Sequence, residues 1–92
     1  MAQSVTECLA VGSNSVDLIN GINADGASSS YAQCLANQAA INARVQRNVN
    51  HLEVILAYTA TDSTPNIARA ASNLKTAHVA AVTTGKAYIA AN

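Results

Sequence analysis

The fold is indicated most clearly by residues 31–58, YAQCLANQAAINARVQRNVNHLEVILAY, which contain neither Gly nor Pro. Ala, Leu, Gln and Arg are frequent in this run, and all four favour helix. The three serines at 28–30 precede it with hydroxyls that suit an N-cap. We therefore predict one long helix over about residues 29–61. Its buried stripe includes Tyr31, Leu35, Ile41, Val45, Leu52, Ile55 and Leu56.

A third helix is predicted over about residues 65–90. Thr64 suits an N-cap, and Pro65 suits the first helical position, where its missing N–H is no loss. Leu74 and Tyr88 lie on the stripe that this helix would turn toward the preceding one. The link between the two helices is short, so we expect an elongated antiparallel hairpin. Alanine lies along both helices, which favours close packing of their axes.

The chain before this hairpin predicts a first helix over about residues 5–24. Ser4 and Glu7 have the spacing of a capping box, and Asp25-Gly26 supply turn chemistry at the other end. The small and polar residues at 12–15 weaken the apolar stripe of this helix. The fold class is therefore all-α with three helices, and residues 1–92 form a single helical assembly domain.

Composition predicts a weak core and a surface poor in charge. The chain has 92 residues, twenty of them Ala, with no Phe or Trp, 11% charged residues and a formal net charge of zero. Such a balance excludes a typical nucleic-acid binder and a polybasic membrane binder. Small side chains recover little of the conformational entropy that folding costs. We expect copies of the chain to complete each other's cores, so that the main partner is the chain itself.

Charge is sorted along the sequence. Residues 1–43 carry three acids and no base, whereas residues 44–92 carry five bases and two acids. The acidic first helix could lie on the basic hairpin of its own subunit or dock on that of a neighbour, and the second arrangement propagates into a filament or ribbon. The candidate assembly or switch residues are Glu7, Asp17, Asp25, Arg44, Arg47, His51, Glu53, Arg69, Lys75 and His78.

Motifs for catalysis or ligand binding are not found. The sequence has no Gly-rich phosphate loop and no Cys pair at metal-ligand spacing. Cys34 and His51 would lie far apart on one continuous helix, which argues against a nucleophile pair. We predict a protein that is no enzyme and has no catalytic residue, cofactor or metal. Cys8 and Cys34 are expected to be two small hydrophobic residues, and their pairing stays open.

The cellular compartment of the protein can also be predicted from the sequence. The start, Met1-Ala2-Gln3-Ser4, has neither the basic nor the apolar region of a secretory signal. No apolar run approaches the length of a membrane span, which is about 20 residues. We expect a cytoplasmic protein, in the form of an insoluble inclusion if it polymerises, that contacts membranes only indirectly.

Several segments resemble the RebB-like proteins that build bacterial R-bodies. The matching pieces are Ser4-Val5-Thr6-Glu7, the polar-apolar stretch 12–19, Tyr31-Ala32-Gln33 and Ala80-Ala81-Val82-Thr83-Thr84-Gly85. The resemblance implies a cytoplasmic ribbon, built with copies of itself or with paralogous subunits, that unrolls when pH falls and ruptures membranes. Two other functions remain open: a subunit of another helical-hairpin filament, such as a secretion needle or exported pilus, and a small adaptor that binds a partner helix.

Overall fold

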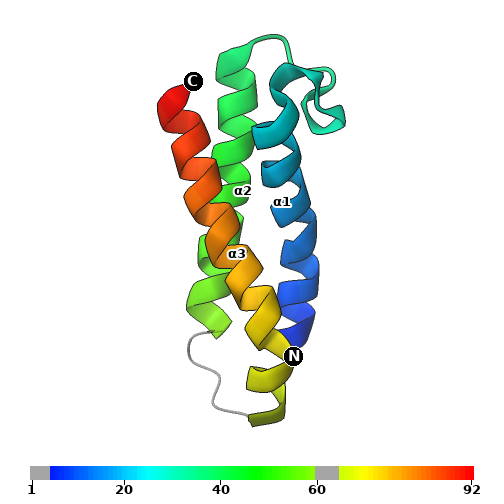
Figure 1. Ribbon diagram of the computed structural model, residues 1–92, viewed down its shortest axis with the longest axis vertical. Coiled ribbons are helices and arrows are strands. Elements are labelled where there is room, and N and C mark those ends of the chain that lie inside the picture. Colours follow the sequence, from blue (N-terminus) through cyan, green and yellow to red (C-terminus); the bar gives the residue numbers. More distant parts are fainter. Residues whose placement is uncertain (1–4, 60–64) are drawn as a thin grey trace.

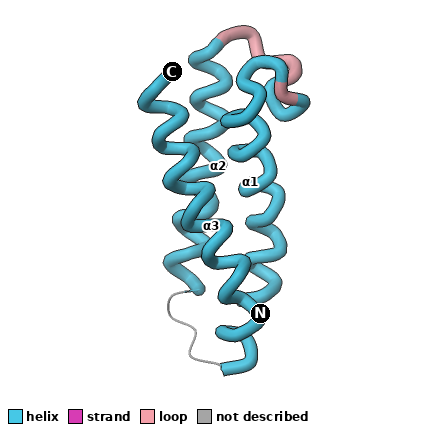
Figure 2. Tube along the Cα trace, viewed as in Figure 1, coloured by secondary structure: helices cyan, strands magenta, loops and turns pink. Residues whose placement is uncertain are grey.

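The protein is a bundle of three helices (Figure 1). The computed structural model describes the backbone of residues 5–59 and 65–92 and the side chains of residues 9–57 and 75–92. Helix α1 spans Val5–Asp25, α2 spans Gln38–Thr59 and α3 spans Pro65–Ala91, with short 3-10 turns η1 (Gly26–Ser28) and η2 (Ser30–Ala32) between α1 and α2. Helix α2 runs antiparallel to α1 and α3 (Figure 2).

The shape is elongated. The principal extents are 43 × 24 × 17 Å and the radius of gyration is 14.0 Å, whereas a compact domain of this length has a radius of about 12 Å. The predicted all-α fold with three helices is confirmed, as is the packing of α2 against α3 as a hairpin. Helix α1 packs against both of them, so the three helices enclose a common core.

The second helix begins nine residues later than the predicted start at residue 29. The connection before it is held by local polar contacts. Ser29 Oγ accepts from the Tyr31 amide at 3.1 Å. Cys34 adopts a left-handed φ of 68°, which is incompatible with a right-handed α-helix. Asn37 Oδ1 then accepts from the Ala40 amide at 2.9 Å, which makes Asn37 the N-cap of α2. Helix α2 is consequently about 33 Å long.

The predicted bounds of α1 (5–24) and α3 (65–90) agree with the structure to within one residue, and the predicted end of the second helix at residue 61 lies outside the described residues. Helix α1 ends at Asp25, where Gly26 takes the left-handed φ of 57° that glycine adopts without strain. Helix α3 begins at Pro65. The predicted caps at Ser4 and Thr64 lie outside the described residues.

The described core is formed mainly by β-branched and leucine side chains of α1 and α2, and α3 adds Ala81 and Tyr88. Its buried apolar members in the helices include Leu9, Val16, Ile19, Ile22, Ile41, Val45, Val49, Leu52, Ile55, Ala81 and Tyr88. Close approach of α3 occurs at Gly85, where an added Cβ would lie 2.5 Å from Val49 Cγ2. Ala32 and Ala81 are the buried alanines among residues of described burial, and most others are exposed. Alanine therefore lines the surface more than the hairpin contact.

None of the helices in the part of the chain that the structure describes combines the length and apolar character needed to cross a bilayer.

Candidate assembly surface

A polar contact of the buried Ser15 fixes the axial position of α1 relative to α2. Ser15 of α1 is only 4% exposed. Its hydroxyl donates to Asn48 Oδ1 at 2.8 Å and lies 3.3 Å from His51 Nδ1. Asn48 Nδ2 in turn donates to the carbonyl of Arg44 at 2.8 Å. The bond to Asn48 gives the buried Ser15 hydroxyl a partner on α2, so it specifies the axial position of α1 along α2.

Ser15 and His51 are residue types that can act as a nucleophile and its general base. The geometry here indicates a role in helix packing instead. The Ser15 hydroxyl directs its proton to Asn48 rather than to the imidazole, and burial keeps substrates away from the oxygen. The backbone N–H groups around Ser15 lie within α1 and are used by helix hydrogen bonds. Among the described residues, no group of three His, Cys, Asp or Glu could hold a metal ion.

The predicted charged residues with described side chains lie mostly at the surface. Asp17 and Asp25 of α1 and Arg47 of α2 are exposed and form no ion pair with any described residue. Helix α1 does lie on the hairpin of its own subunit, yet Asp17 and Asp25 form no ion pair with a described base of the hairpin. The acidic and basic halves of the described surface therefore remain available to a neighbour.

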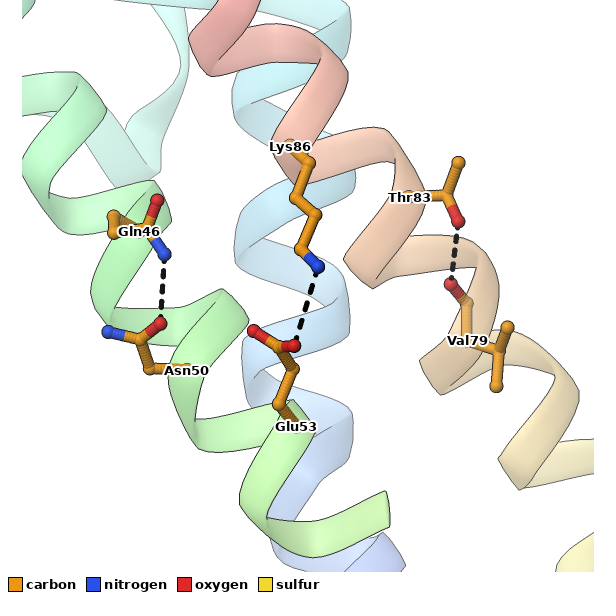
Figure 3. A network of polar contacts seen from close by, with 6 residues as sticks. All are labelled: Gln46, Asn50, Glu53, Val79, Thr83 and Lys86. Atoms are coloured by element: carbon orange, nitrogen blue, oxygen red, sulfur yellow. Dashed lines mark hydrogen bonds and ion pairs between the residues drawn. The ribbon is translucent and has the colours of Figure 1, made fainter. Parts of the chain in front are cut away.

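One ion pair is found among the described residues, between Lys86 Nζ of α3 and Glu53 Oε2 of α2 at 3.4 Å (Figure 3). Both side chains are about half exposed, so this pair adds little to stability. Arg44 is engaged within the subunit, because its guanidinium donates to the carbonyl of Tyr31 at 2.8 Å and holds the η2 turn against α2.

The remaining assembly and switch candidates are scattered. His51 is exposed, Lys75 is half-buried, and His78 is fully buried with its ring against Gly12 of α1. The side chains of Glu7 and Arg69 lie outside the described residues. The structure thus does not gather the predicted residues into one site.

The residues predicted for the hairpin core occupy three kinds of position. Ile41, Val45, Leu52, Ile55 and Tyr88 are buried, whereas Leu35 and Leu56 are partly buried. Tyr31 differs from the prediction, because it lies in η2 and covers Gly21 of α1 with its ring instead of entering the hairpin. The side chain of Leu74 lies outside the described residues.

The outward faces of the helices carry small and apolar side chains. A valine is exposed on each helix: Val11 at 48%, Val54 at 70% and Val79 at 53%. The same three helices also carry exposed alanines, such as Ala10, Ala43, Ala80 and Ala87. These exposed apolar residues were not predicted from the sequence. They could have been predicted, because these valines and alanines fall outside the helical periodicity of the buried stripe.

Polar groups on these outward faces bond along their own helix. The Gln46 amide donates to Asn50 Oδ1 at 2.8 Å, and the Thr83 hydroxyl donates to the Val79 carbonyl at 3.3 Å (Figure 3). These two side chains therefore use part of their hydrogen-bonding capacity within their own helix.

No protein-family model, curated protein or solved structure matches this chain.

Proposed function

We propose that the protein is a structural subunit that assembles with copies of itself into a helical filament or ribbon. The observation that supports this most strongly is the outward placement of alanine and valine on all three helices. A helix that faces water in a monomeric bundle carries charged and polar residues on that face. The outer faces here would lose water favourably if another subunit covered them.

The charge distribution of the chain also supports self-assembly. A formal net charge of zero means that copies do not repel one another through net charge. Within the described part of the chain, a single ion pair links α2 and α3, while exposed acids on α1 and an exposed base on α2 stay unpaired. Copies can therefore approach one another and still form opposite-charge contacts.

An R-body-type inclusion, which responds to pH and ruptures membranes, is the specific form that we propose for the assembly. Its support is the resemblance of this sequence to RebB-like proteins at segments such as Tyr31-Ala32-Gln33. In this form, the subunits would build a ribbon in the cytoplasm, alone or with paralogous chains.

Negative-stain microscopy of the purified protein tests the proposal. We expect ribbons or filaments of regular width in wild-type protein at micromolar concentration. Fields that contain only isolated particles of subunit size would contradict it, provided that circular dichroism shows the chain to be helical.

A further inference from the structure

One face of α1 carries an acid among small residues. Ala10, Asn14 and Asp17 are spaced by four and three residues, which places them along one side of the helix, and all three are exposed. Asp17 is the one charged residue of this set. We call these three residues the α1 face.

A corresponding face of α2 carries a base. Arg47, Asn50 and Val54 are spaced by three and four residues, and all three are exposed. Val54, at 70%, is the most exposed large hydrophobic residue among those described. We call these three residues the α2 face.

The two faces lie at the same height along the bundle. Ser15 hydrogen-bonds Asn48, so these two residues mark a common level. Counting from that level at about 1.5 Å per residue along antiparallel helices, Asp17 lies within about 1.5 Å of the height of Arg47. The same count matches Asn14 with Asn50 and Ala10 with Val54. A neighbour placed alongside without axial shift would thus bring opposite charges, two amides and two apolar groups together.

We propose that the α1 face of one copy docks on the α2 face of a second copy as an antiparallel helix pair. Asp17 would pair with Arg47, Asn14 would bond to Asn50, and Val54 would cover Ala10. The small residues of the α1 face let the helix axes approach closely. The opposite charges fix which faces meet and in which register.

This contact rests on the proposed self-assembly and specifies its interface. It joins two different faces, so each bound copy still presents one free α1 face and one free α2 face. Such a heterologous contact repeats and gives a ring where its rotation closes or an open filament where it does not.

A charge swap, read by sedimentation velocity at low salt, tests the contact. Asp17→Arg and Arg47→Glu each place like charges opposite one another, so each should raise the concentration needed for half-assembly by on the order of tenfold or more. The double variant D17R/R47E restores opposite charges and should return close to wild type. Asp25→Arg is the matched control, because it makes the same charge change on α1 at the height of the uncharged Gln38.

The outcomes separate this contact from the proposed function. If the wild-type chain assembles but D17R and R47E assemble equally well, or the double variant stays as impaired as the singles, the contact is wrong and self-assembly stands. A helical wild-type chain that never assembles overturns both.

A cysteine cross-link tests the register. In a background of Cys8→Ser and Cys34→Ser, protein carrying Asn14→Cys is mixed with protein carrying Asn50→Cys and oxidised. We expect a mixed disulfide dimer, because paired residues of close helices reach the Cα separation of about 4.4–6.8 Å that a disulfide needs. Asn14→Cys mixed with Gln46→Cys, one turn away, should cross-link much less. Equal cross-linking of both mixtures, or dimers from Asn14→Cys alone, would contradict the register.

Discussion

Ser15 is the single residue on which the alignment of α1 with α2 depends most. Its hydroxyl is buried and bonds Asn48, so Ser15→Ala leaves the Asn48 oxygen without that donor. We expect the free energy of unfolding to fall by about 1–2 kcal/mol. Urea unfolding at a fixed, low protein concentration measures this without a contribution from assembly.

Ser13 provides the matched control. Its hydroxyl bonds only the Leu9 carbonyl of its own helix, at 3.1 Å. Ser13→Ala gives up that bond and gains helix propensity, so its unfolding free energy should stay within about 0.5 kcal/mol of wild type. Equal effects at Ser13 and Ser15 would show that the contact to Asn48 does not hold the helices together.

Gly85 is a point of close approach between α3 and α2. Gly85→Ala gains about 1 kcal/mol of helix propensity, but the new Cβ would lie 2.5 Å from Val49 Cγ2 in a buried position. Overpacking of this kind costs about 1–3 kcal/mol, so we expect a net loss of stability in thermal unfolding. Val49→Ala removes the methyl groups that the new Cβ would contact. The double variant should therefore lose less unfolding free energy than the two single variants lose in total. A rise in melting temperature for Gly85→Ala alone would contradict the close packing.

At the scale of the elements, the start of α2 depends on its cap. Asn37→Ala removes the acceptor for the Ala40 amide and should lower the unfolding free energy by about 1 kcal/mol. Asn37→Asp keeps the acceptor and adds a negative charge at the helix N-terminus, so it should match or exceed wild type. Both are measured by urea unfolding. If Asn37→Ala matched wild type, the cap would not contribute to the start of the helix.

The elements could be predicted from the sequence wherever a residue type forces the backbone. Asp25-Gly26 and Pro65 gave the end of α1 and the start of α3 correctly, because a left-handed glycine and a fixed proline φ are local properties. The start of α2 was predicted nine residues early, since the absence of Gly and Pro does not require a helix. The contacts that hold η2, such as Arg44 to the Tyr31 carbonyl, join residues thirteen apart and have no periodic signature.

At the scale of the whole molecule, the sequence predicted the separation of charge but not its placement. The count of acids and bases could not show whether α1 neutralises its own hairpin. That depends on side-chain direction, and the structure turns Asp17 and Asp25 outward. The Ser15–Asn48 contact was likewise missed, because it pairs two polar residues that flank the apolar stripes of different helices. Both features follow from the rotation of each helix about its axis.

The central claim is that the outer faces of this bundle are built to be covered by other copies. Sedimentation velocity of the wild-type chain over a dilution series tests it most directly. We expect species far heavier than 9.4 kDa at micromolar concentration, which dissociate on dilution and in molar salt as the charges are screened. A helical chain that sediments as one 9.4 kDa particle at every concentration would contradict the claim.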